Sequence, residues 1–247
     1  MHWASRSTSE MPMSVAPDRR VGRELRVVWL AGLMSYRATW DLQRAIHAER
    51  RADRCPDTLL LLEHLPVITI GHNGKMSNLT AGLELLRERG VDLVRTDRGG
   101  DVTYHGPGQL VGYLIVDLKG LHGSVRRFAG DVEEGMIRAV GRWGISARHD
   151  RERTGVWVGD EKLASIGLRV SRWVTMHGFA LNVATDLGAF DLIVPCGIEG
   201  CRITSMKRLV GTTVNLQEVG NAVAEELARL WGLSLPPAGK KGGKALG

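Results

Sequence analysis

Several features that would define other classes of protein are missing from this sequence. Its 247 residues include only three cysteines, an odd number with no spacing typical of a disulfide scaffold. No stretch approaches the roughly 18 consecutive apolar residues that a membrane span needs. The first ten residues also lack the apolar core of a signal peptide. We therefore expect a cytoplasmic protein with no membrane partner.

Two common functional motifs are missing as well. The sequence has no G-x-S-x-G, the motif that presents the nucleophilic serine of α/β-hydrolases. It has no G-x-x-x-x-G-K-[ST], the loop whose backbone N–H groups bind nucleotide phosphates. The sequence therefore gives no signal for either chemistry.

The positive charge is concentrated at the ends of the chain. The net charge is +6, of which residues 1–22 contribute +1 and residues 236–247 contribute +3. The part between them carries only +2. A broad nucleic-acid-binding field is therefore not expected, and we predict no nucleic-acid partner. A local basic patch for an acidic protein partner is still compatible with this charge.

Composition also divides the chain into a central domain and two tails. Residues 1–22 are polar, contain Pro12 and Pro17, and predict a disordered N-terminal tail. Residues 236–247 predict a flexible Gly/Lys-rich C-terminal tail. Residues 23–235 show no internal repeat of roughly 20 to 50 residues, and their length fits one domain. We interpret them as a single folded domain.

Hydrophobic periodicity and turn residues predict both strands and helices in this domain. The expected strands cover 25–30, 58–63, 66–71, 91–95, 102–104, 109–117 and 174–183, with a hairpin over 154–170 that turns at Gly159-Asp160. The expected helices cover 36–54, 83–89, 124–143 and 212–231. Consecutive hairpins in the second half exclude a strictly alternating βαβ barrel. We predict a single α/β (α+β) domain with a mixed, largely antiparallel sheet flanked by helices.

Two details of this pattern can be tested against a structure. In the first helix, Trp40, Ala45 and Ile46 are available to an inward face, whereas His47 is expected on the helix surface. Strands 58–63 and 66–71 are joined by a short link and are candidates for pairing with each other.

The most distinctive segment is 98–109, with the sequence RGGDVTYHGPGQ. Its four glycines lead directly into the apolar run 109–117, which predicts a buried strand. Because glycine has no Cβ, such a segment lets a ligand come close to the backbone. A tight β-turn with bulge glycines is the simpler alternative.

Cys196 is a candidate nucleophile in the segment Pro195-Cys-Gly197, where proline stiffens one side and glycine clears space on the other. A lone cysteine is most often a small buried hydrophobe, however, and Cys201 has similar local surroundings. The spacing Cys196-x4-Cys201 matches half of a zinc site, but a second Cys/His pair at suitable spacing is missing. We predict no metal site, and Cys55 is expected to be inert.

Lys162, His105 and His177 are the remaining candidates for proton transfer. Lys162 lies at the hairpin turn, where a solvated lysine is the simpler interpretation. A lysine near a thiol favours the thiolate, and a lysine in an apolar site can act as a base. His105 lies in the glycine-rich segment and His177 precedes Gly178, so both are candidate acids, bases or hydrogen-bonding groups.

Four segments taken together resemble the octanoyltransferase (lipoyl/octanoyl-protein ligase B) family. They are residues 98–109, Lys162 with 165–167, 178–180 with Asn182, and 195–197. The resemblance extends from about Glu63 to the helix near Asn221 and leaves both tails outside. It implies the fold of the biotin/lipoate protein ligase catalytic domain for residues 23–235.

The resemblance also implies roles for particular residues. Cys196 is expected to carry the acyl group and Lys162 to tune it. Acyl-substrate binding is expected from Arg98, Gly99, Gly100, Asp101, Val102, Thr103, Tyr104, His105, Ser165, Ile166, Gly167, Gly178, Phe179 and Ala180. Supporting roles are expected for His64, His177 and Asn182.

The activity implied by the resemblance is acyl transfer. An octanoyl or lipoyl group would pass from the thioester of acyl carrier protein to Cys196. It would then pass to a lysine ε-amine on lipoyl domains of 2-oxoacid dehydrogenase complexes or on the glycine cleavage H protein, as the first step of endogenous protein lipoylation. Lys162 or His105 would take the proton of that amine. A thioester is already activated, so neither ATP, nor a metal, nor another cofactor is expected.

Two alternatives have distinct signatures. An ATP-dependent lipoate or biotin protein ligase would need a nucleotide-phosphate site and would stay active without a cysteine nucleophile. A non-enzymatic nucleic-acid-binding module would show salt-sensitive binding to duplex after removal of the tails.

Overall fold

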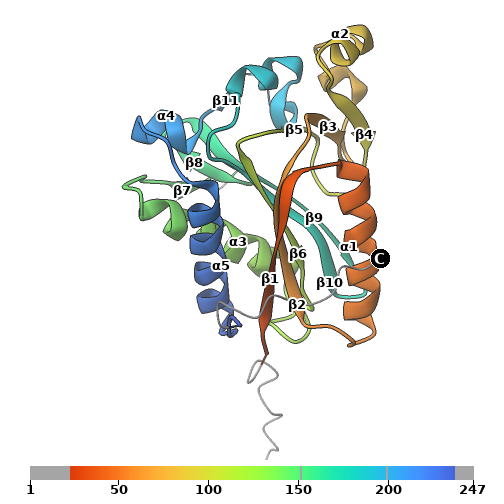
Figure 1. Cartoon of the computed structure of the whole chain (residues 1–247), viewed down its shortest axis with the longest axis vertical. Helices are drawn as coiled ribbons and strands as arrows, with labels where there is room; N and C mark the ends of the chain where they lie inside the picture. Colours follow the sequence, from red (N-terminus) through yellow and green to blue (C-terminus); the bar gives the residue numbers. More distant parts are fainter. Residues whose placement is uncertain (1–22, 151, 199, 237–247) are drawn as a thin grey trace, which may run out of the picture.

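A central eight-stranded sheet carries long helices on both of its faces (Figure 1). This architecture comes from a computed structural model, which describes residues 23–150, 152–198 and 200–236. The predicted N-terminal tail lies outside the described residues, as does the predicted C-terminal tail except for Pro236.

The main sheet is mixed and largely antiparallel, as the sequence predicts. Its strands lie in the order β1 (Leu25–Met34), β2 (Asp57–His64), β6 (Gln109–Ile115), β10 (Val174–Asn182), β9 (Glu161–Ser171), β8 (Val156–Val158) and β7 (Arg148–His149), and β11 (Arg202–Ile203) pairs with β9. Among the described strands of this sheet, only the pairs β1–β2 and β9–β11 are parallel. The predicted two-residue turn at Gly159-Asp160 joins β8 to β9, with Val158 opposite Glu161.

A second, three-stranded sheet has the order β4 (Asp92–Arg95), β3 (Val67–Ile70) and β5 (Val102–His105). The predicted pairing of 58–63 with 66–71 is therefore wrong, because β2 and β3 lie in different sheets. Each already has two other partners: β2 lies between β1 and β6, and β3 lies between β4 and β5. The helix α2 (Leu83–Glu88) and the short turn η1 (Met76–Asn78) belong to this upper part of the molecule (Figure 1).

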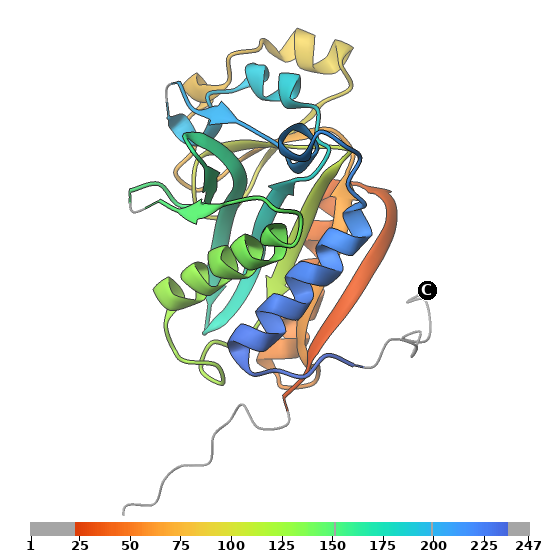
Figure 2. The ribbon, with the colours of Figure 1, turned by 90° about the vertical axis from the view of Figure 1, so that its left-hand side faces the viewer.

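Helices cover the main sheet on opposite faces. The helix α1 (Tyr36–Arg51) lies against one face, and α3 (Val125–Gly141) and α5 (Leu216–Trp231) lie side by side on the other (Figures 1 and 2). The side chains of β2 alternate between these layers: Leu59 and Leu61 belong to the core under α3 and α5, whereas Leu60 belongs to the core under α1. A central strand buried on both faces explains the apolar run in the sequence.

The ends of the long helices follow from side-chain and glycine caps. The Ser124 hydroxyl accepts a hydrogen bond from the backbone N–H of Arg127 and caps the start of α3. The Asn215 side chain caps α5 in the same way, and Gly232 ends that helix in the left-handed conformation. A short helix, α4 (Met206–Val210), precedes α5.

The inward face of α1 is partly polar, which the sequence pattern did not predict, although Trp40 and Ile46 pack against the core as predicted. Ala45 is exposed and His47 is buried, so both assignments for these residues are wrong. The buried polar residues of α1 are Thr39, Gln43, His47 and Arg50, which recur at helical spacing. Two of them contact β10: the Gln43 amide oxygen accepts from the His177 backbone N–H, and His47 Nε2 lies 3.3 Å from the Val174 carbonyl.

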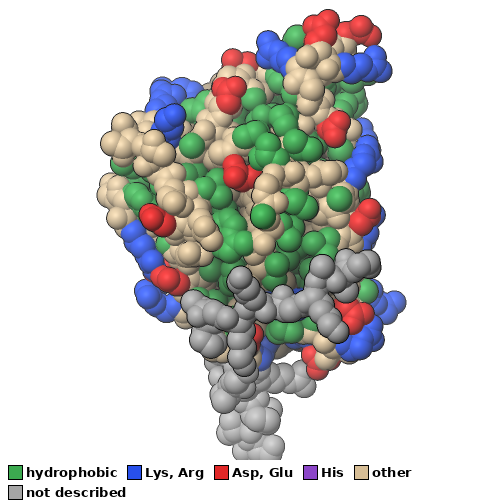
Figure 3. Space-filling view, viewed as in Figure 1, with side chains coloured by type: hydrophobic (Ala, Val, Ile, Leu, Met, Phe, Trp, Pro, Cys, Tyr) green, Lys and Arg blue, Asp and Glu red, His purple; other side chains and the backbone are tan. Residues whose placement is uncertain are grey.

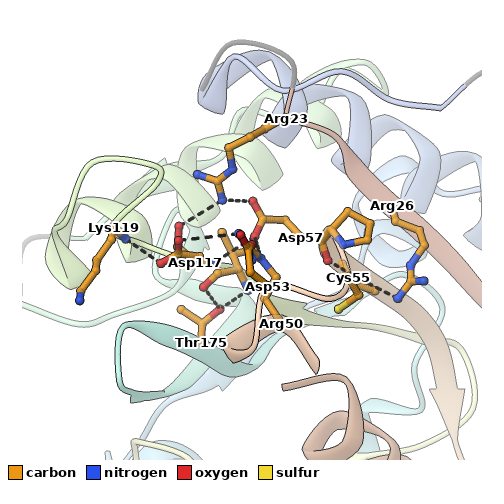
Figure 4. Close-up of polar contacts among 12 residues, drawn as sticks. Arg23, Arg26, Arg50, Asp53, Cys55, Asp57, Asp117, Lys119 and Thr175 are labelled. Atoms are coloured by element: carbon orange, nitrogen blue, oxygen red, sulfur yellow. Dashed lines mark hydrogen bonds and ion pairs between the residues drawn. The ribbon is translucent and has the colours of Figure 1, made fainter. Parts of the chain in front are cut away.

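A buried carboxylate, Asp57, ties together the lower ends of several elements (Figure 4). Arg50 at the end of α1 donates to it at 2.8 Å, and Arg23 before β1 also pairs with it. The backbone N–H of Asp117, after β6, donates to the same carboxylate at 2.9 Å. Burying an ion pair costs desolvation free energy, which these several hydrogen bonds offset.

Replacing Asp57 by asparagine removes the carboxylate that Arg23 pairs with and the most buried of the three carboxylates around Arg50, which are Asp53, Asp57 and Asp117. We expect Asp57→Asn to lower the free energy of unfolding by about 3–5 kcal/mol, as for other buried pairs broken on one side. Asp41→Asn is the matched control, because Asp41 pairs with Arg44 on the surface and should change stability by less than about 1 kcal/mol. Urea denaturation measures both, and equal stabilities for the two variants would contradict the prediction.

The surface around β1 is comparatively apolar. β1 forms one edge of the main sheet, and Leu33 near its end is 44 % exposed. Figure 3 shows hydrophobic side chains gathered over the middle of this face, with Lys and Arg side chains mainly at its margins. Among the described residues, no helix is long and apolar enough to cross a membrane.

Candidate active site

A cavity of about 220 Å3 lies where the glycine-rich segment, β9, β10 and the Cys196 turn converge. It is lined by Tyr36, Arg98, Gly100, Asp101, Val102, Thr103, His105, Val111, Tyr113, Glu152, Arg153, Thr154, Lys162, Ser165, Ile166, Gly167, His177, Gly178, Phe179, Ala180, Cys196 and Ile198. Segments that are distant in the sequence thus form one site.

Lys162 and Cys196 meet at one end of this cavity. The Lys162 ammonium nitrogen Nζ lies 3.0 Å from the Cys196 sulfur Sγ. Lys162 is only 3 % exposed, so it is not the solvated turn lysine of the simpler interpretation. The Trp157 ring lies 5.3 Å from Nζ, at a distance typical of a cation–π contact. A Cβ at residue 155 would lie 2.6 Å from Lys162 Cε, so Gly155 provides room for the lysine stem.

The backbone of the turn η3 (Pro195–Gly197) adopts an unusual conformation. Cys196 has φ 58°, which non-glycine residues rarely adopt. The glycine-rich segment packs directly against this turn. A Cβ on Gly197 would lie only 2.5 Å from the Asp101 carboxylate, so a glycine is needed there. Asn78 donates to that carboxylate at 2.7 Å and accepts from the Val194 backbone N–H at 2.8 Å through its own carbonyl. The strain at Cys196 is thus held by contacts on both sides.

Arg98 brings a guanidinium group to the cavity wall. Its Nε and Nη2 donate to the Thr69 hydroxyl, and Nη2 also donates to the Thr69 carbonyl at 2.7 Å. Its Nη1 donates to the Gly99 carbonyl at 3.0 Å. No carboxylate pairs with Arg98 within the described ranges, and burial lowers the pKa of this guanidinium. Arg98 therefore places a positive charge, held by neutral groups, beside the cavity.

Two glycines let β6 and β10 approach closely where they form the cavity. A Cβ on Gly178 would overlap the Gly112 carbonyl oxygen, and a Cβ on Gly112 would overlap the Phe179 ring. Gly167 faces the glycine-rich segment in the same way, since its Cβ would lie 2.8 Å from the Gly99 carbonyl oxygen. At these three positions the neighbouring segments lie too close for a side chain, and the absence of side chains leaves room for a ligand beside the backbone.

Aromatic and histidine side chains form another part of the cavity wall. The Tyr36 ring stacks on His105 at 6.0 Å, and His64 lies behind them. His64 Nδ1 donates to the Met34 carbonyl at 2.9 Å, so its Nε2 accepts from the Tyr113 hydroxyl at 2.6 Å. Burial lowers the pKa of His64 to about 4 and that of His105 well below its ordinary value. Both histidines are therefore neutral at physiological pH.

His177 lines the cavity from β10 with a positive φ of 59°. Its Nε2 donates to the Asp97 carboxylate at 2.7 Å, and Arg169 pairs with the same carboxylate. Burial lowers the pKa of His177, although the Asp97 carboxylate opposes this effect. The hydrogen bond from His177 in turn lowers the pKa of Asp97.

Most residues predicted for substrate binding line the cavity. The exceptions are Gly99, whose backbone pairs with Leu168, and Tyr104, whose ring packs on Phe190. His64 and Asn182 lie behind the wall. His105 lies beside Tyr36 and His64.

The sequence missed several cavity residues because no local motif marks them. They come from the start of α1 (Tyr36), from β6 (Val111 and Tyr113) and from two loops (152–154 and Ile198). Asp97 directly precedes the glycine-rich segment, but only the fold brings it to His177, which is 80 residues away in the sequence.

The other cysteines lie outside this cavity. Burial raises the pKa of the Cys201 thiol and that of Cys55. Within residues 23–150, 152–198 and 200–236, no group of three or more His, Cys, Asp or Glu side chains is placed to hold a metal ion.

This fold is shared with solved structures of lipoate ligases. A bipartite lipoate protein ligase from Thermoplasma acidophilum superposes with a TM-score of 0.66 at 15% identity, over 87% of this chain and 85% of that one. Lipoate-protein ligase A, solved with ATP, superposes with a TM-score of 0.67 at 17% identity, over 86% and 87% of the two chains. Residues 35–228 match the family described as lipoyl protein ligase A/B catalytic domain.

Sequence similarity defines the branch of this family. The chain is 46% identical to an octanoyltransferase of Solibacter usitatus, over 83% of this chain and 93% of that protein. It is 44% identical to an octanoyltransferase of Rubrobacter xylanophilus, over 87% and 96%. The chain belongs to the octanoyltransferases of the lipoyl protein ligase A/B catalytic-domain family.

The same substitution should have opposite effects at Gly178, where β6 and β10 approach closely, and at Gly130, which has open space around it. Gly178→Ala places a methyl group against the Gly112 carbonyl and should cost about 1–3 kcal/mol of stability. Gly130→Ala in α3 meets no atom within 4 Å and should stabilise by about 0.5–1 kcal/mol. Thermal unfolding measures both. A stabilised Gly178→Ala protein would show that the strands have room to separate.

Proposed function

We propose that this protein transfers an octanoyl group from a carrier thioester to a lysine of a lipoyl domain, through a thioester on Cys196. The observation that carries the proposal is the 3.0 Å contact between Lys162 Nζ and Cys196 Sγ at the end of a largely apolar cavity. Family membership supports the acyl group and the lipoylation role. Acyl carrier protein is the proposed donor, and lipoyl domains of 2-oxoacid dehydrogenase complexes and the glycine cleavage H protein are the proposed acceptors.

In the first half-reaction, the Cys196 thiolate attacks the carbonyl carbon of the donor thioester. The nearby Lys162 ammonium favours that thiolate. The C–S bond to the carrier then breaks, and the departing thiolate takes a proton from Lys162. The products are an acylated Cys196, a free carrier thiol and a neutral Lys162.

In the second half-reaction, the acceptor amine attacks the acyl carbon and Cys196 departs as a thiolate. The neutral Lys162 takes the proton that the amine loses, so the amide forms and the ion pair is restored. His105 is the less suitable base, since both of its ring nitrogens lie within hydrogen-bond distance of other side chains, those of Gln109 and Thr69, and burial lowers its pKa well below the ordinary value. The proton therefore stays within one pair of residues over the whole cycle.

The cavity wall suits a medium-length acyl chain. Val111, Ile166, Phe179 and Ala180 supply apolar surface, and Gly167 and Gly178 leave the space between them. Each methylene group transferred from water to this wall contributes about 0.8 kcal/mol to binding.

Intact mass measurement after incubation with octanoyl-acyl carrier protein tests this function directly. We expect one octanoyl group on the protein without ATP, located on Cys196 by peptide mapping. Cys196→Ser should abolish acyl transfer, whereas Cys201→Ser should retain it, because Cys201 lies outside the cavity. Strict dependence on ATP together with an active Cys196→Ser protein would instead indicate a ligase.

Lys162→Ala tests the proposed pairing with Cys196. Loss of the ammonium should slow the alkylation of Cys196 at neutral pH and slow both half-reactions by about 100-fold or more. Lys162→Arg should keep part of the charge effect but lose proton transfer, because arginine stays protonated. Lys207→Ala, an exposed lysine on α4, is the control. An unchanged alkylation profile in Lys162→Ala would refute the pairing.

A further inference from the structure

We infer that the buried amide pair Gln109–Asn182 is a positioning unit for the Lys162–Cys196 site. The inference rests on the proposed function, because it concerns the geometry of the same two residues. Neither amide lines the cavity, so the pair acts through other residues rather than on substrate. Both side chains are almost fully buried, where an amide is retained only with its hydrogen bonds satisfied.

The pair connects the His105 ring to the Lys162 backbone by a continuous series of hydrogen bonds. His105 Nδ1 lies 2.8 Å from the Gln109 amide oxygen, and Gln109 Nε2 lies 3.0 Å from the Asn182 amide oxygen. Asn182 Nδ2 lies 3.1 Å from the Thr204 carbonyl oxygen. The Thr204 backbone N–H in turn donates to the Lys162 carbonyl at 3.0 Å.

The direction of every hydrogen bond in this series is determined. A carbonyl oxygen only accepts, so Asn182 must turn its NH2 group toward Thr204 and its oxygen toward Gln109. The Gln109 NH2 group then donates both to Asn182 and to the Tyr104 carbonyl. Its oxygen is left to accept, and His105 must carry its proton on Nδ1.

The same hydrogen bonds connect the segment that follows Cys196 to the strand that carries Lys162. β11 begins six residues after Cys196, and Ile203 pairs with Lys162 in a parallel ladder. Asn182 binds the carbonyl of the next residue, Thr204, whose N–H binds Lys162. The segment that follows the Cys196 turn is thus fixed, from Arg202 onward, against the backbone of Lys162.

The isosteric variant Asn182→Asp separates positioning from packing. A protonated aspartic acid can donate to Thr204 and accept from Gln109, as asparagine does. An aspartate places a negative oxygen against the Thr204 carbonyl and loses the donor. The titratable groups connected to residue 182 are His105 through Gln109 and Lys162 through Thr204. Both groups are present in the variant and in the wild-type protein. Dividing the variant rate by the wild-type rate at each pH therefore cancels the effect of their own titration.

The experiment measures Cys196 alkylation by iodoacetamide and single-turnover acyl transfer between pH 5.5 and 9, conditions that bracket ordinary thiol and histidine titration. We expect the ratio for Asn182→Asp to fall on the order of tenfold or more as the pH rises. For Asn182→Ala, the ratio should be low at every pH. Asn221→Asp is the matched control, because Asn221 only accepts, from Trp29 Nε1, and its ratio should stay near one.

Two results would overturn the inference. One is a ratio for Asn182→Asp that does not depend on pH, whether near that of the wild type or near that of Asn182→Ala. The other is measured on the wild-type protein and needs no variant to fold: ring-nitrogen NMR that places the His105 proton on Nε2. Alkylation needs no acyl donor, so failure of wild-type Cys196 to accept octanoyl refutes the proposed function while leaving this test intact.

Discussion

The contact between a buried ammonium and a thiol sets the requirements that the surrounding structure meets. An ammonium removed from water needs compensating interactions, and Lys162 finds them in the Cys196 sulfur and the face of Trp157. The contact also requires two segments to approach more closely than side chains allow. Gly155 makes room for the lysine, and Gly197 makes room for the cysteine turn beside Asp101. The close approach of Lys162 and Cys196 thus depends on the glycines at these two positions.

A second requirement is that the layer opposite the helices α3 and α5 hold the sheet in a fixed position. The buried face of α1 does so with polar as well as apolar side chains: Gln43 and His47 contact the backbone of β10, and Arg50 binds Asp57. Hydrogen bonds specify direction and distance, which apolar contacts do not. Gln43 in particular holds the backbone of His177, which keeps a positive φ where β10 forms the cavity. The helix therefore supports the site through polar contacts, at the cost of desolvating them.

The parts of the site that sequence could predict are those encoded locally. The glycine-rich segment, the hairpin at Gly159-Asp160 and the Pro195-Cys-Gly197 turn all depend on residues whose backbone preferences are intrinsic. The fold class followed from strand and helix patterns for the same reason. Tyr36, Tyr113 and Asp97 could not be predicted, because their roles arise only when α1, β6 and the second sheet come together. His47 and Ala45 were misplaced since periodicity assumes that a buried helix face is apolar.

The comparison with lipoate ligases separates the role of the fold from that of single residues. At 15–17% identity the shared architecture shows the fold alone, and one of those structures was solved with ATP bound. A fold does not determine a reaction; the groups placed in its site do. In this chain a thiol stands 3.0 Å from a buried lysine, and its turn is strained at φ 58°. A strained backbone persists only where neighbouring contacts maintain it, here Asn78 and Asp101 on one side and the β11 ladder on the other. A cysteine that merely filled space would need none of these contacts, so the surroundings of Cys196 argue for chemistry at its sulfur.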